Sequence, residues 1–135
     1  MREIKFRGKR IDNGEWVYGG IATTAINHNT VIVCENRNTY YGIVPYIVDP
    51  ATVGQYTGLK DHNGVEIWEG DISQFEFEGI KYKTCPVKYE VELSCFHTDL
   101  RFGNTIPEDL FLQFDQELKD TYEVIGNIHD NPELL

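Results

Sequence analysis

Short runs of apolar residues, separated by turn signals, occupy most of the chain. Val, Ile, Tyr, Phe and Thr are concentrated in these runs, and Asn-Gly, Glu-Gly and Asp-Pro sequences interrupt them at short intervals. Many short β-favouring runs at such spacing are typical of an antiparallel sandwich or barrel. No repeat, linker or low-complexity tract divides the chain. The pattern therefore predicts an all-β protein that forms a single domain over residues 1–135.

The first two runs predict a hairpin about Asn13-Gly14. This dipeptide suits the central positions of a type I′ turn, where both φ angles are positive. Such a turn pairs residues whose numbers sum to 27, so that Lys9 faces Tyr18. Side chains alternate along strands, so this register also assigns two faces. The core face carries Ile4, Phe6, Val17 and Ile21, and the opposite face carries Lys5, Arg7, Lys9, Trp16 and Tyr18.

A second hairpin is predicted about the sequence Asp61-His62-Asn63-Gly64. A type I turn followed by a left-handed Gly64 fits these residues, and so does a tight Asn63-Gly64 turn. The two alternatives differ in strand pairing by one residue, and both stay open. Further strands are predicted over residues 31–34, 40–48, 72–77, 86–96 and 121–126. Pro45 cannot donate to a ladder, so its strand is expected at a sheet edge or a bulge.

One short helix is predicted near the C-terminus, over residues 107–119. Pro107, Glu108 and Asp109 are favourable first-turn residues. An apolar stripe then follows at helical spacing, made of Leu110, Phe111, Phe114 and Leu118.

Composition and charge narrow the function classes. Hydrophobic residues make up 41% and charged residues 25%, which are ordinary globular fractions. The longest apolar run, residues 43–48, is too short to cross a membrane. Residues 1–10 carry five bases and one acid, whereas residues 11–135 carry seven bases and 21 acids. A body with a net charge of −14 repels a phosphate backbone, so only a local nucleic-acid contact through the basic N-terminal strand stays open.

The cysteines and the N-terminus indicate a cytoplasmic protein. Cys34, Cys85 and Cys95 are odd in number and widely spaced, which disfavours a secreted disulfide framework. The sequence MREIKFRGKR contains no apolar segment after its charges, so it does not resemble a signal peptide.

Two groups of residues could hold a metal, and each has a simpler interpretation. Cys95 and His97 make half of a tetrahedral zinc site, but a core cysteine beside a surface histidine is favoured. Glu66, Glu69 and Asp71 could hold Mg²⁺ in a metal-dependent phosphodiesterase, but a solvated strand face is favoured. The chain contains no serine-hydrolase elbow and no nucleotide-binding loop. We therefore assign no catalytic, cofactor-binding or metal-binding residue.

The basic and aromatic face of the first hairpin is the strongest binding candidate. Bases of a single-stranded nucleic acid could stack on Trp16 or Tyr18 while Lys5, Arg7 and Lys9 meet its phosphates. Two other interpretations are favoured over it. In the first, Lys9 packs over Tyr18 as a cation–π pair. In the second, the face docks onto an acidic surface of a neighbouring subunit.

Three segments carry a resemblance to a known family. Residues 53–72 (VGQYTGLKDHNGVEIWEGDI), residues 123–135 (EVIGNIHDNPELL) and residues 4–9 (IKFRGK) resemble the core, ending and start of the YopX-like family. The segments fall in the family's order, so the resemblance covers the whole chain. Trp68 stands where the family usually has Tyr. The resemblance implies a mostly β protein of phages and prophages and a homo-oligomer, and it supplies no activity, cofactor or catalytic residue.

The sequence as a whole predicts a non-enzymatic interaction protein. We expect it to act as a homo-oligomer in the cytoplasm of an infected or lysogenic bacterial cell, with itself, a host protein or a phage protein as partner. The basic N-terminal strand and the acidic body make a head-to-tail or edge contact between subunits electrostatically plausible.

Overall fold

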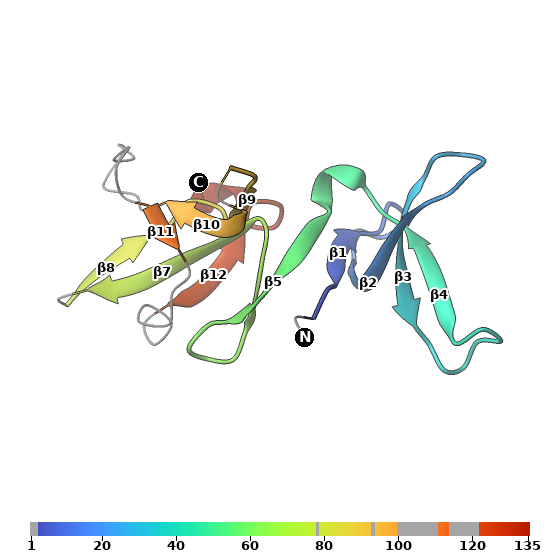
Figure 1. The fold of residues 1–135 in the computed structure, drawn as a ribbon, viewed down its shortest axis with the longest axis horizontal. Coiled ribbons are helices and arrows are strands. Elements are labelled where there is room, and N and C mark those ends of the chain that lie inside the picture. Colours follow the sequence, from blue (N-terminus) through green and yellow to red (C-terminus); the bar gives the residue numbers. More distant parts are fainter. Residues whose placement is uncertain (1–2, 78, 93, 100–110, 114–121) are drawn as a thin grey trace. The chain divides into compact units, whose positions relative to one another are not determined.

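Antiparallel sheet makes up nearly all of the regular structure (Figure 1), in agreement with the all-β prediction. The computed structural model describes residues 3–77, 79–92, 94–99, 111–113 and 122–135. The chain divides into two compact units, Met1–Tyr56 and Thr57–Leu135. We call them the N-terminal and C-terminal units and describe each by itself. The expectation of a single domain stays a prediction.

The N-terminal unit is one sheet layer whose first four strands run as a meander. Its strands are β1 (Phe6–Lys9), β2 (Trp16–Thr23), β3 (Thr30–Glu35), β4 (Ile43–Ile47) and the start of β5 (Gly54–Lys60). Their order in the sheet is β4-β3-β2-β1-β5, with β4 at the edge. The 3-10 helix η1 (Pro50–Thr52) connects β4 to β5. Pro45 therefore lies in an edge strand, as its missing N–H group predicts.

The first hairpin forms, but its register differs from the prediction by two residues. Arg7 pairs with Tyr18 and Lys9 with Trp16, so paired numbers sum to 25. The Arg10 N–H donates to the Glu15 carbonyl, which closes a four-residue loop in place of a type I′ turn. Within this loop only Gly14 has a positive φ, of 72°. A shift of two residues keeps every side chain on its predicted face.

The predicted burial of the two hairpin faces is wrong in part. Ile4 and Ile21 are exposed, whereas Arg7 on the supposed wet face is only 6% exposed. The physical reason is that an arginine can bury its aliphatic stem and guanidinium plane against an aromatic ring. Arg7 does this with the guanidinium 4.6 Å from the Trp16 ring centroid.

The described residues of the C-terminal unit form two three-stranded sheets and the hairpin that precedes them. β6 (Glu66–Trp68) neighbours the later part of β5. One sheet has the order β12-β7-β8, from Glu123–Asn127, Asp71–Phe77 and Ile80–Lys83. The other has the order β11-β10-β9, from Phe111–Gln113, Cys95–Asp99 and Lys88–Glu90. Their core is a buried cluster of Ile67, Phe75, Val87, Phe96 and Tyr122.

The turn between β5 and β6 is the type I alternative. Gly64 has a φ of 80° and its N–H donates to the Asp61 carbonyl at 3.0 Å. Asn63 does not have a positive φ, which excludes the tight Asn63-Gly64 turn. The Asp61 carboxylate accepts from the N–H groups of Asn63 and Val65, both at 2.9 Å.

In the C-terminal half of the chain, the strand predicted over residues 86–96 and the helix predicted over residues 107–119 differ from the structure. Within residues 86–96 the strand is interrupted, because β9 ends at Glu90 and β10 begins at Cys95; between them the Ser94 N–H donates to the Val91 carbonyl at 3.2 Å, and Ser94 has a φ of 52°. The hairpin brings Phe96 against Tyr89 with ring centroids 5.1 Å apart. The helix predicted over 107–119 is not confirmed. Residues 111–113 form strand β11, which pairs with β10, and the rest of that segment lies outside the described residues.

Candidate interaction surface

The predicted basic and aromatic residues do come together, mainly with one another. Lys9 lies with its ammonium 5.4 Å from the centroid of the Trp16 ring, which Arg7 also covers. Lys5 lies 4.8 Å from the Tyr56 ring centroid. A cation–π pairing of Lys9 therefore exists with Trp16, the residue that lies opposite Lys9 in the observed register. Tyr18 remains about half exposed.

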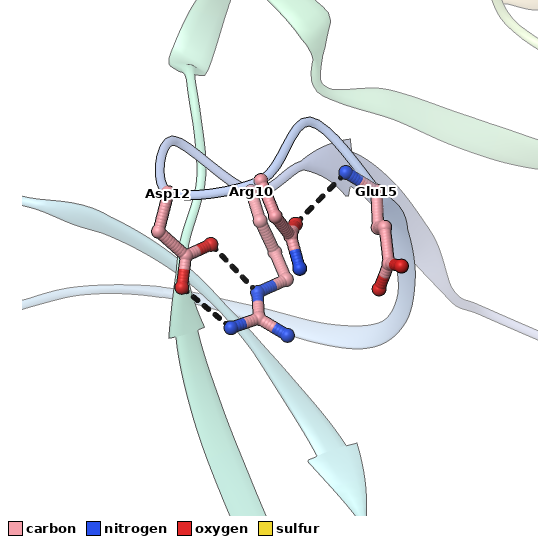
Figure 2. A network of polar contacts seen from close by, with 4 residues as sticks. Arg10, Asp12 and Glu15 are labelled. Carbon is pink, nitrogen blue, oxygen red and sulfur yellow. Dashed lines mark hydrogen bonds and ion pairs between the residues drawn. The ribbon is translucent and has the colours of Figure 1, made fainter.

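The loop of the first hairpin places Arg10 in a local ion pair (Figure 2). Its Nε donates to Asp12 Oδ1 at 2.9 Å, and a second guanidinium nitrogen donates to Oδ2. The hydrogen bond from Arg10 is the main cause that lowers the pKa of Asp12 below its usual value. The same guanidinium lies 4.4 Å from the Tyr46 ring centroid. The bases of residues 5–10 thus all engage rings or carboxylates of the N-terminal unit.

The three acidic residues considered for metal chemistry do not form a metal site, and the side chain of His97 lies outside the described part of the structure. Among the described residues, no group of three or more His, Cys, Asp and Glu side chains could hold a metal ion. Glu66, Glu69 and Asp71 therefore do not converge as the phosphodiesterase alternative requires. The Asp71 carboxylate is buried and accepts from the Trp68 N–H at 2.8 Å, which is a structural use. Cys34, Cys85 and Cys95 are free thiols.

A surface that the sequence reasoning did not single out lies on the β2–β4 meander. Residues 16–48 contain 33 residues but only two charged ones, Glu35 and Arg37. Within this region Tyr40 and Tyr41 are 95% and 82% exposed, and their rings meet edge to face at 4.9 Å. On β4, Ile43 and Ile47 are 49% and 40% exposed. The near absence of charged residues from this stretch is the sequence signal that could have identified the surface.

Uncharged, tyrosine-rich and apolar surface is the composition of interface cores. Charged residues are depleted there and aromatic residues are enriched. The sheet of the N-terminal unit already buries Val31, Ile32 and Val48, whereas Tyr40, Tyr41, Ile43 and Ile47 stay exposed outside this core. The meander therefore has the features of a contact surface.

Comparison with known proteins places the chain in a family. The sequence pattern of the family described as "YopX protein" matches residues 5–135, which is nearly the whole chain. The chain belongs to the YopX family. The match runs through both units, and it includes the Asp61–Gly64 turn and the C-terminal segment that suggested the resemblance.

One solved structure is similar over its full length. Protein EF1440 from Enterococcus faecalis is 25% identical, with a TM-score of 0.56, and the alignment covers 100% of this chain and 99% of that one. No curated protein matches the chain. Among the described residues, no helix is long and apolar enough to span a bilayer. Membership of the YopX family thus supports the fold and leaves the function to be argued from the surface.

Proposed function

We propose that this YopX-family chain is a non-enzymatic interaction protein that acts as a homo-oligomer. We further propose that it is phage-encoded and works in the cytoplasm of an infected or lysogenic bacterial cell, where a host or phage protein is a second partner. The observation that supports an interaction role most strongly is the exposed, nearly uncharged β2–β4 meander.

The charge distribution favours self-association through the N-terminal unit. Residues 1–56 carry six bases and five acids, a net charge of +1, whereas residues 57–135 carry six bases and 17 acids, a net charge of −11. Two copies repel each other wherever their acidic surfaces approach. The least repulsion is expected where the N-terminal unit meets a partner.

Sedimentation equilibrium of the full chain tests this function. We expect a concentration-dependent association in the micromolar range. Only monomer at these concentrations, in both low and moderate salt, would contradict the proposal.

Single-stranded nucleic-acid binding through Lys5, Arg7, Lys9, Trp16 and Tyr18 has less support. Arg7 is buried, and the Trp16 ring on which a base would stack is covered by two cations. A labelled oligonucleotide at low salt distinguishes the two functions. Binding that weakens with salt and is lost in Trp16→Ala would favour the nucleic-acid alternative.

A further inference from the structure

The outward row of edge strand β4 has an unusual side-chain composition. Ile43, Pro45 and Ile47 occupy alternate positions and are exposed, whereas Val44 and Tyr46 between them are half-buried. We call Ile43, Pro45 and Ile47 the β4 row. Edge strands commonly carry lysine or other charges that prevent association, and the β4 row carries none.

The backbone of β4 is poorly suited to adding a further strand. The Asn36 N–H donates to the Gly42 carbonyl, so the ladder places the outward-pointing backbone groups of β4 at Ile43, Pro45 and Ile47. Pro45 has no N–H group. The carbonyls of Ile43 and Ile47 already accept hydrogen bonds.

Both hydrogen-bond donors come from neighbouring loops. The Ile43 carbonyl accepts from Thr39 Oγ1 at 3.0 Å, and the Ile47 carbonyl accepts from the Ile11 N–H at 3.2 Å. A partner strand would therefore meet an interrupted row of donors and acceptors. Contact through side chains is favoured over strand addition.

Given the proposed homo-oligomer, the charge pattern favours the β4 row as the surface where a second copy binds. A chain with a net charge of −10 repels its own copies, and an uncharged row is where two copies can approach without desolvating like charges. Apolar side chains of both copies would then be buried from water, and this burial is the main favourable contribution to association. A two-fold contact of this kind uses the same patch on both subunits.

We propose that the β4 row packs, side chain to side chain, against the β4 row of a second copy in an isologous contact. This inference rests on the proposed function, because it names the surface through which the homo-oligomer forms. It replaces a head-to-tail contact between the basic N-terminal strand and an acidic surface.

Single lysine substitutions in the full chain test the inference. Ile43→Lys and Ile47→Lys each place a charge in the β4 row, at positions exposed enough for the fold to tolerate them. Ile21→Lys is the matched control, because Ile21 is 43% exposed and its neighbour Ile32 pairs with Tyr46, on the opposite face of the sheet. All three variants change the net charge equally.

Sedimentation equilibrium and circular dichroism provide the readouts. We expect the dissociation constant of Ile43→Lys and Ile47→Lys to rise at least about tenfold, as for loss of a central interface residue, while Ile21→Lys associates like the wild type. If one row variant fails to fold, the other decides. Wild-type association that both row variants retain would overturn the β4 contact and leave the proposed function standing. A wild-type monomer would overturn both.

Discussion

At the scale of single residues, the Asp61 carboxylate holds two distant segments of the C-terminal unit together. It is buried, and its Oδ1 accepts from the N–H groups of Asn63 and Val65, which fixes the turn. Its Oδ2 accepts from the N–H of Val124 in β12, at 3.0 Å. The neighbouring His62 N–H donates to the Tyr122 carbonyl. The family-like segments around residues 61 and 124 thus meet in space through one side chain.

Replacing this carboxylate by an amide is expected to destabilise the chain. In Asp61→Asn an NH₂ group takes the place of one acceptor oxygen and faces a backbone donor, so at least one buried N–H loses its partner. Such a loss costs about 2–3 kcal/mol. Urea unfolding at neutral pH measures it, with Asp12→Asn as the control, because Asp12 is exposed and its ion pair contributes little. Equal stability of both variants would contradict the role assigned to Asp61.

The phenol of Tyr122 makes stability depend on alkaline pH. Burial raises its pKa to about 12, from 10. The folded state therefore keeps the proton that the unfolded chain releases near pH 10. The stabilisation is fully present below pH 10 and is lost as pH rises towards 12, by about 1.4 kcal/mol per pH unit.

Tyr122→Phe removes this titration. We expect the difference in unfolding free energy between wild type and variant to be constant below pH 10 and to change in favour of the variant above it. Urea unfolding at several pH values from 8 to about 11.5 makes the comparison. A difference that stays constant throughout would show that the Tyr122 proton does not contribute.

At the scale of elements, the pairing of β2 with β3 depends on the absence of a side chain at one glycine. A Cβ at Gly19 would lie 2.0 Å from the Val33 carbonyl oxygen, whereas a Cβ at Gly20 would have no neighbour within 4 Å. Adjacent residues of the same strand thus provide a matched pair of substitutions.

Gly19→Ala is expected to be strongly destabilising and Gly20→Ala close to neutral. The first forces the two backbones apart across a sheet ladder, a kind of strain that costs on the order of several kcal/mol. Thermal unfolding followed by circular dichroism compares the two variants. If both melted at the same temperature as the wild type, β2 and β3 would not approach as closely as described.

The elements themselves could be predicted largely from local chemistry, and the errors have physical causes. Turn residues and β-branched runs located most strands, and Pro45 identified the edge. The register of the first hairpin was wrong because Asn13 uses its side chain to accept from the Glu15 N–H at 3.0 Å, which favours a wider loop. Residues 111–113 read as part of a helix because apolar spacing alone does not exclude pairing with a distant strand.

The candidate surface was only partly predictable for a similar reason. The alternation of side chains along the strands correctly predicted that the basic and aromatic residues share one face, since a register shift of two residues leaves every side chain on the same face. Burial is a property of tertiary packing, however, and the stacking of Arg7 on Trp16 made a charged residue part of the interior. The exposed β4 row could not be recognised before its strand was known to lie at an edge.

At the scale of the whole molecule, the net charge of −10 predicts how association responds to salt. Raising NaCl from about 10 mM to about 150 mM shortens the Debye length from about 30 Å to about 8 Å. If two copies meet through the uncharged β4 row, salt screens only the repulsion between their acidic surfaces, so the dissociation constant should fall. A head-to-tail contact between the basic N-terminal strand and an acidic surface would weaken instead. Sedimentation equilibrium across this salt range therefore separates the two arrangements without any substitution, and association that weakens with salt would contradict the β4 contact.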